Sequence, residues 1–450
     1  MRDGVPHDQH PGSPLKARLG PAVTDHQLFL FLVEVLVLVA GARVGGEIAI
    51  RLGIAQVVGE LAIGICLGPS LFGKLWPGGF AALFPSDTLQ RGLLEILSWI
   101  GVIFLVVLSG LETHIDIVLK AKRAVLRGWI GGFFLPFALG LGLGWLIPAR
   151  LIGAGIDRSV FALFIATAMS ISAIPVIARI LMDLDLFQTR IGTIVMSTAV
   201  ADDTVGWIVL AVISGLALRH RVNAGVVATA LVGTAAFLVL ALTVGQRLVR
   251  GAMRSSERLR IPFAQSTVIM LIVFAGGAIT QAIHVHLVLG CFVAGILVAR
   301  ASSKGGDADA FESMRRLGMA FFVPFFFGYT GIKVDLTTLT GSALPVAVAA
   351  VILAYTGKFV GGGVGARWGG LPKWEAMAVG AGLNARGAME LVIAAVGLSI
   401  GILTVPMYTI IVLIAVLTSL TAAPMLRYCV RKNEGLRAAA SIPPRPTQAG

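Results

Sequence analysis

Two adjacent carboxylates lie in the middle of an apolar stretch of this sequence. Asp202 and Asp203 are flanked on each side by roughly ten mostly apolar residues. A charged side chain at the centre of a bilayer costs several kcal/mol, so such groups mark paths for ions or protons. Neighbouring side chains on a helix point about 100° apart, so we expect the two aspartates to have different partners and roles. A purely structural pair, neutralised by helix ends or a basic partner, is the alternative.

A lysine occupies a similar setting. Lys358 lies near the middle of the apolar segment 343–367. A buried ammonium group needs a carboxylate partner or it loses its proton. We therefore predict that Lys358 pairs with Asp202 or Asp203. The alternative is that its long side chain reaches the membrane surface, which its central position disfavours.

A third charged pair lies further along the chain. Arg386 and Glu390 are four residues apart, so on a helix they share one face. We predict a structural ion pair that braces an interrupted helix. A direct role of this pair in transport is the alternative.

Two apolar segments are interrupted. Residues 170–175 read Ser-Ile-Ser-Ala-Ile-Pro, and residues 380–387 read Gly-Ala-Gly-Leu-Asn-Ala-Arg-Gly. Pro175 lacks a backbone donor, and the glycines around Asn384 weaken a helix. Broken helices at matching places in two halves of a transporter point to a binding site. Ordinary kinking of membrane helices is the alternative.

The composition shows which environment must surround these groups. Of 450 residues, 57% are hydrophobic, 55 are glycine and only 13% are charged, about half the charged share of a soluble domain. This excludes a soluble enzyme, a disordered chain and a nucleic-acid binder, and leaves a helical membrane protein. The sequence has neither a phosphate-binding loop nor a potassium-channel filter, which disfavours an ATP-driven pump and a potassium channel. The three cysteines lie far apart, so we expect no metal or redox cofactor.

The elements that position the charged groups are apolar segments of about the ~20 residues that a helix needs to span a bilayer. About thirteen follow one another, at residues 28–49, 55–73, 93–110, 125–148, 159–182, 191–218, 223–247, 264–284, 286–302, 316–333, 343–367, 374–398 and 404–428. We expect residues 1–26 to form a flexible N-terminal extension and residues 429–450 a short basic tail.

The charges in the connecting loops predict the orientation. Lys and Arg are concentrated in four places, 111–127, 247–260, 300–316 and the C-terminal tail, and are absent from 284–287 and 398–404. Basic loops face the cytoplasm, so the net charge of +13 needs no nucleic acid. We predict a cytoplasmic C-terminus and an N-terminus outside. Thirteen segments divide into six, one linker and six, which predicts an all-α polytopic fold with two inverted repeats.

Several short motifs, in this order and spacing, are similar to one known family. They are Val57 to Glu60, Leu67 to Ser70, Leu108 to Glu112, Ser170 to Pro175, Ala201 to Asp203, His286 to Gly295 and Gly382 to Gly387. Together they resemble the monovalent cation:proton antiporters, specifically the second large family of bacterial sodium/proton and potassium/proton exchangers. The match covers about residues 30–428. One departure is Ile54-Ala55, where the family often has Gln-Pro.

The resemblance implies a division of the membrane part, 27–428. Residues 27–110 and 264–333 would form a dimerisation part, and 125–218 with 343–428 a mobile core. Residues 223–247 would form a linker helix. The two broken helices would cross beside the aspartates, and a homodimer would move its cores like elevators.

The resemblance also implies roles for the charged residues. Asp203 would be the ligand of the monovalent cation, with Ser170, Ser172 and Thr198 as further oxygen donors, while Asp202 would pair with Lys358. A cation and a proton would compete for the same oxygens. The expected function is exchange of Na⁺, or of K⁺ or Li⁺, for protons across the cell membrane, with net movement of charge.

Three rival functions stay open on the sequence. A channel would use the aspartates as a selectivity ring, and a sensor would bind a ligand without net flux. An antiporter for an organic or anionic solute is the third.

Overall fold

The computed structural model describes residues 23–113, 123–217, 224–283, 285–302 and 308–432. Within these residues the regular structure is helical, apart from one isolated bridge between Ile152 and Leu403. The helices are α1 (Asp25–Arg51), α2 (Gln56–Leu67), α3 (Phe72–Leu75), α4 (Pro77–Leu83), α5 (Thr88–Glu112), α7 (Arg123–Leu146), α8 (Arg158–Ala168), α9 (Ile174–Asp183), α10 (Arg190–Ala217), α11 (Ala224–Leu240), α12 (Gln246–Ser256), α13 (Ala264–Ala282), α14 (Leu287–Ala301), α15 (Ala308–Leu317), α16 (Val323–Ile332), α17 (Ala343–Trp368), α18 (Lys373–Leu383), α19 (Ala388–Ser399) and α20 (Val405–Lys432).

Every predicted apolar segment coincides with at least one helix. Ten helical stretches of the described residues are long and apolar enough to cross a membrane, or eleven if the bent pair α18 and α19 counts as one span. The segments predicted at 159–182 and 286–302 contain shorter helices, α8 with α9 and α14. The count of thirteen spans therefore stays a prediction.

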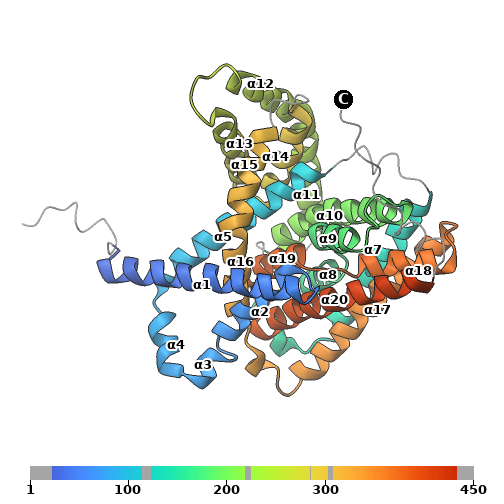
Figure 1. The fold of residues 1–450 in the computed structure, drawn as a ribbon, viewed down its shortest axis with the longest axis horizontal. Helices are drawn as coiled ribbons and strands as arrows, with labels where there is room; N and C mark the ends of the chain where they lie inside the picture. The colour runs from blue at the N-terminus through green and yellow to red at the C-terminus, as the bar shows by residue number, and fades with distance from the viewer. Residues whose placement is uncertain (1–22, 114–122, 218–223, 284, 303–307, 433–450) are drawn as a thin grey trace, which may run out of the picture.

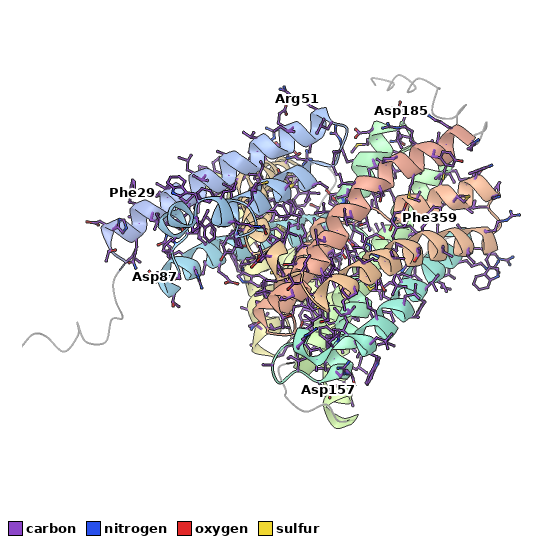
Figure 2. All side chains as sticks on the ribbon, turned by 90° about the horizontal axis from the view of Figure 1, so that it is seen from below. Phe29, Arg51, Asp87, Asp157, Asp185 and Phe359 are labelled. Carbon is purple, nitrogen blue, oxygen red and sulfur yellow. The ribbon has the colours of Figure 1, made fainter. Side chains whose placement is uncertain are left out.

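Polar side chains mark where several helices begin. Thr24 accepts a hydrogen bond from Gln27 N at 3.2 Å to start α1, and Asp157 accepts one from Ser159 N at 2.7 Å to start α8. Such caps satisfy backbone N–H groups that have no partner within the helix. Asp87 caps α5 in the same way. Figure 2 shows Asp87 and Asp157 toward one side of the molecule, and Arg51 and Asp185 toward the opposite side.

The helices pack in two groups. The first group consists of α1, α2, α5, α13, α14 and α16, and the second of α7 to α10 with α17 to α20. Figure 1 shows α12 to α15 gathered at the top of the view and α7, α17 and α18 at the right. α11 follows α10 and continues through a π-helical turn into α12, which packs on α13 and α14. Whether the first group forms the dimer and the second moves stays a prediction.

Glycine allows the closest approach in the second group. A Cβ on Gly131 of α7 would overlap the carbonyl oxygen of Gly361 of α17, and a Cβ on Gly361 would overlap that of Gly131. Small residues let two membrane helices approach until their backbones touch. Gly361 lies within one turn of Lys358 on α17, so this contact fixes the position of Lys358 along α7.

Candidate functional site

Helix α10 carries the two aspartates near its middle, and α17 supplies their basic neighbour. The side chains of Asp202, Asp203 and Lys358 are all 0% exposed. Lys358 Nζ lies 2.6 Å from Asp202 Oδ2 and also donates to the carbonyl oxygen of Ser170. Of the two pairings that the sequence left open, the structure contains the one with Asp202.

A serine from the first helix break also contacts Asp202. Ser172 Oγ lies 2.9 Å from Asp202 Oδ2 and 2.8 Å from the carbonyl oxygen of Leu383. A hydroxyl has one proton, so it donates to one of these oxygens at a time. Asp202 Oδ2 thus lies within hydrogen-bond distance of one ammonium and one hydroxyl group.

Asp203 has different surroundings. Ser109 Oγ of α5 donates a hydrogen bond to Asp203 Oδ2 at 3.1 Å. In the part of the chain that the structure describes, Asp203 forms no ion pair, and its Oδ1 has no hydrogen-bond partner. The two neighbouring carboxylates therefore differ as the helix geometry predicts: one is paired with a cation of the protein, and the other is not.

The two helix breaks touch each other. Residues 169–173 separate α8 from α9, and residues 384–387 separate α18 from α19, which are bent by 41°. The backbone N–H of Ala173 donates to the carbonyl oxygen of Ala385 at 3.0 Å, so the broken helices cross at this point. Pro175 lies in the first turn of α9, where its missing N–H removes no helical hydrogen bond. The proline therefore starts a helix rather than interrupting one.

Arg386 binds the broken helices together. Its side chain is 0% exposed, and Nη1 lies 3.2 Å from Glu390 Oε1. The guanidinium also donates to the carbonyl oxygens of Ala168 at 3.2 Å and Met169 at 2.5 Å, and to that of Ala354 in α17 at 3.1 Å. The last carbonyls of a helix have no partner within it, and a cation there is favourable. The predicted pair with Glu390 is thus one part of a larger brace.

Other predicted polar residues of the site differ in whether their side chains already have hydrogen-bond partners. Thr198 lies one turn before Asp202 on α10 and is 0% exposed. Asn384, also 0% exposed, lies at the second break. Among the described residues, neither the Thr198 hydroxyl nor the Asn384 amide has a hydrogen-bond partner. Ser170 instead donates its hydroxyl proton to the carbonyl oxygen of Ala166 at 2.7 Å. The roles of Thr198 and Ser170 as cation ligands stay predictions, as does the structural role of Asn384 at the second break.

The buried charges do not balance. Three carboxylates, Asp202, Asp203 and Glu390, share this region with two bases, Lys358 and Arg386, and all five are at most 1% exposed. When all are ionised, one negative charge is left over. An unpaired buried charge is costly, and one proton or one monovalent cation would neutralise it. Among the described residues, Asp203 is the carboxylate of these three that forms no ion pair.

The sequence did not assign a role to Ser109. Ser109 belongs to α5, 94 residues before its partner Asp203. Their hydrogen bond connects the first helix group to the second. The apolar segment 93–110 contains two hydroxyl residues, Ser98 and Ser109, and nothing in the segment distinguishes their roles. No local spacing connects Ser109 to α10, so only the packing of the two groups identifies it.

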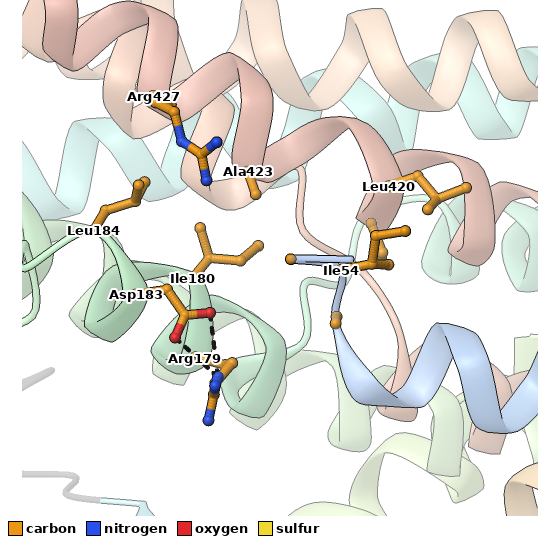
Figure 3. Close-up of a pocket in the computed structure, with 11 residues that line it drawn as sticks. Ile54, Arg179, Ile180, Asp183, Leu184, Leu420, Ala423 and Arg427 are labelled. Atoms are coloured by element: carbon orange, nitrogen blue, oxygen red, sulfur yellow. Dashed lines mark hydrogen bonds and ion pairs between the residues drawn. The ribbon is translucent and has the colours of Figure 1, made fainter. Parts of the chain in front are cut away.

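The space between the two groups differs on the two sides of the site. On the Arg51 side, Figure 3 shows Ile54 next to Ile180 and Ala423, around a cavity of about 20 Å³, room for about one water molecule. Arg179 and Asp183 pair at 3.0 Å in its wall. On the Asp87 side, a cavity of about 770 Å³ separates Tyr329 and other residues of the first group from residues of α19 and α20.

Known proteins are similar to this chain in sequence and in fold. Residues 35–431 match the family of transmembrane sodium/hydrogen exchangers. The Na⁺/H⁺ antiporter NhaS4 from Synechocystis is 32% identical over 403 residues, which cover 89% of this chain and 97% of NhaS4. The Na⁺/H⁺-K⁺ antiporter GerN from Bacillus cereus is 28% identical, over 89% of this chain and 96% of GerN. The chain spans about half the length of the Arabidopsis thaliana Cation/H⁺ antiporter 18, with 30% identity.

A solved structure supports the same assignment at the level of the fold. The sodium proton antiporter MjNhaP1 from Methanocaldococcus jannaschii superposes with a TM-score of 0.63 over 92% of this chain and 100% of MjNhaP1, at 14% identity. The sequence matches extend this from fold to family. The chain belongs to the sodium/hydrogen exchanger family, whose members are multi-pass transmembrane cation:proton antiporters and not enzymes.

Proposed function

We propose that this protein exchanges Na⁺ for protons across the cell membrane, and that K⁺ and Li⁺ are its alternative cations. The observation that carries the proposal is Asp203, a fully buried carboxylate whose one hydrogen bond from the described residues comes from the hydroxyl of Ser109. Such a group is neutralised by one proton or one cation, and the two compete for the same oxygens. The names of NhaS4, a Na⁺/H⁺ antiporter, and GerN, a Na⁺/H⁺-K⁺ antiporter, support this class of substrate.

The cation would be held by oxygen atoms alone. Asp203 supplies the charge, and the unpartnered hydroxyl of Thr198 and the hydroxyl of Ser172 are candidate further ligands. Backbone carbonyls freed at the helix breaks add others. Hard cations prefer such oxygen donors. Asp202 stays paired with Lys358 while the site is empty of cation.

Coupling follows from the cost of moving charge. A site whose charge is neutralised crosses the low-dielectric part of a membrane at far lower cost than an ionised one. We propose that the second helix group carries Asp203 past the first group, as an elevator. Ser109 belongs to the first group and Asp203 to the second, so this hydrogen bond breaks and re-forms in each cycle. The first group forms the contact of a homodimer.

The larger cavity suggests which side this conformation faces. The space between the groups is wide on the Asp87 side and almost closed on the Arg51 side. With the N-terminus outside and the C-terminus cytoplasmic, the Asp87 side is the outer side. We infer an outward-facing conformation.

The orientation is tested by thiol labelling of single cysteines in a background without native cysteines. Asp87→Cys and Asp157→Cys are expected to react with a membrane-impermeant reagent in intact cells. Asp185→Cys is expected to react only after permeabilisation, because Asp185 lies toward the opposite side of the molecule (Figure 2). The reverse pattern contradicts the predicted orientation, and labelling of all three from one side contradicts the placement of the loops.

Transport itself is tested with purified protein in liposomes that enclose a pH-sensitive dye. Added Na⁺ is expected to drive proton movement that choline does not, because choline has too large a head group for a site of carboxylate and hydroxyl oxygens. Li⁺ and K⁺ added singly define the cation selectivity. Flux of Na⁺ with no proton movement would instead indicate a channel, and binding with no flux of either ion would indicate a sensor.

A further inference from the structure

The cavity on the Asp87 side has charged walls. Its lining includes three carboxylates, Glu34, Glu95 and Asp335, and two bases, Arg91 and Lys333. Residues of both helix groups line it, since α1, α5 and α16 face α19 and the start of α20 across it. A cation that approaches the boundary between the groups from this side therefore passes these side chains.

Two of the three carboxylates already have partners. Glu95 Oε1 lies 3.4 Å from Lys333 Nζ, and the ammonium also lies 4.5 Å from the centre of the Tyr329 ring. Asp335 accepts a hydrogen bond from Thr337 N at 3.0 Å and so caps a short helical turn. Both groups are thereby held by the protein itself, and neither needs a ligand.

Glu34 is the exception. It lies on α1, is 0% exposed, and accepts a hydrogen bond from Gln90 Nε2 of α5. Within the described residues it forms no ion pair, although Arg91 lines the same cavity. Glu34 Oε1 and Gln90 Oε1 are both buried without a hydrogen-bond partner among those residues. One carboxylate oxygen and one amide oxygen, on side chains that are joined by a hydrogen bond, are therefore left without a partner.

We infer that Glu34 and Gln90 form a second site for a monovalent cation, in the wall of the cavity and separate from Asp203. An anionic and a neutral oxygen are the donors that hard cations prefer. A site of this kind raises the local concentration of the transported cation on the Asp87 side. The inference rests on the proposed function, because it takes the substrate cation of Asp203 as the ligand.

The test separates the two sites by disabling Asp203. Thermal unfolding of the full chain in nanodiscs is compared in NaCl and choline chloride at constant pH and ionic strength. A ligand that binds only the folded state raises Tm. Asp203→Asn is expected to retain a Na⁺-dependent rise of Tm on the order of 1–3 °C, and Asp203→Asn/Glu34→Gln to lose it.

The matched control is Glu47→Gln. Glu47 lies on the same helix but pairs with Arg51 on the surface, so Asp203→Asn/Glu47→Gln is expected to keep the rise. Gln90→Leu, which removes the amide oxygen and leaves the carboxylate, is the second variant and is expected to reduce the rise in the Asp203→Asn background. In liposomes, Glu34→Gln alone is expected to raise the half-saturating Na⁺ concentration about tenfold, which corresponds to a loss of about 1.4 kcal/mol in binding free energy. The maximal rate is expected to fall by a smaller factor.

Three outcomes would overturn the second site. One is a Na⁺-dependent rise that survives Glu34→Gln in the Asp203→Asn background. Another is the absence of any rise in Asp203→Asn itself, and the third is a rise that depends on pH but not on Na⁺. Failure of the proposed function is distinguishable, since Asp203→Asn would then exchange ions at the wild-type rate whatever its unfolding shows.

Discussion

Asp203→Asn is expected to reduce cation:proton exchange to the rate of protein-free liposomes. An amide can neither release a proton nor hold a cation by charge. The amide can still accept the hydrogen bond of Ser109, and the substitution removes a buried charge that forms no ion pair with the described residues. Folding is therefore expected to be preserved. Dye-reported proton movement measures the exchange, and size-exclusion chromatography together with thermal unfolding measures the folding.

Asp183→Asn is the matched control for this experiment. Asp183 undergoes the same chemical change, but it lies at the end of α9 and pairs with Arg179 at the surface, where ion pairs contribute little. Wild-type exchange is expected from it. Wild-type exchange from Asp203→Asn would remove Asp203 from the site, and an aggregated Asp203→Asn protein would make the residue structural.

The bilayer explains why the positions of the helices could be predicted. An apolar run of about 20 residues is required wherever a helix crosses hydrocarbon, and this requirement is visible locally, as in residues 191–218 and α10. The segment predicted to end at 247 instead continues as α12 to Ser256. The apolar run ends at Arg247, Arg250 and Arg254, and the predicted segment was ended there for that reason. Charged residues are nevertheless compatible with a helix that continues out of the membrane.

The candidate site was predictable in its members but not in its contacts. Burial of Asp202, Asp203 and Lys358 follows from their apolar neighbours in the sequence, because charges inside a membrane need a partner or a function. Which aspartate receives Lys358 depends on the rotation of α10 against α17, and that depends on packing far along the chain.

Contacts between side chains and distant backbone groups were the least predictable part. The spacing of Arg386 and Glu390 predicted their pair through the helical period. The same spacing says nothing about the carbonyl oxygens of Ala168 and Met169, which lie more than 200 positions earlier and also contact Arg386. Those contacts exist because the two broken helices cross, which is a property of the assembled fold.

The second large effect is expected at Lys358, in the electrical behaviour of exchange. Lys358 donates to Asp202 at 2.6 Å. If a cation displaces the proton of the Asp203 carboxyl and also weakens the pair of Asp202 and Lys358, so that Lys358 releases its proton, two protons leave for each cation bound. Exchange then moves net charge. One such charge gains about 2.3 kcal/mol per 100 mV, compared with about 1.4 kcal/mol per proton for one pH unit. Wild-type exchange in liposomes is therefore expected to change with an imposed potential.

Lys358→Gln removes the proton carrier and is expected to be inactive or electroneutral. It also leaves Asp202 buried without its partner, a change that typically costs about 3–5 kcal/mol, so loss of folding has to be separated from loss of coupling. The double variant Asp202→Asn/Lys358→Gln removes both charges and keeps the hydrogen-bonding groups. It is expected to fold and to exchange one proton per cation through Asp203, with a rate that does not respond to the potential.

Lys358→Arg distinguishes a proton carrier from a stabilising charge. Arginine keeps its proton under all relevant conditions, so it can replace the ion pair with Asp202 but cannot contribute a proton to each cycle. Electrogenic exchange by this variant, or by Lys358→Gln, would show that Lys358 only stabilises Asp202 and that the two aspartates carry both protons. A wild-type protein insensitive to the potential would contradict electrogenic exchange itself. Electroneutral exchange in the arginine variant, beside an electrogenic wild type, is the result that assigns the second proton to Lys358.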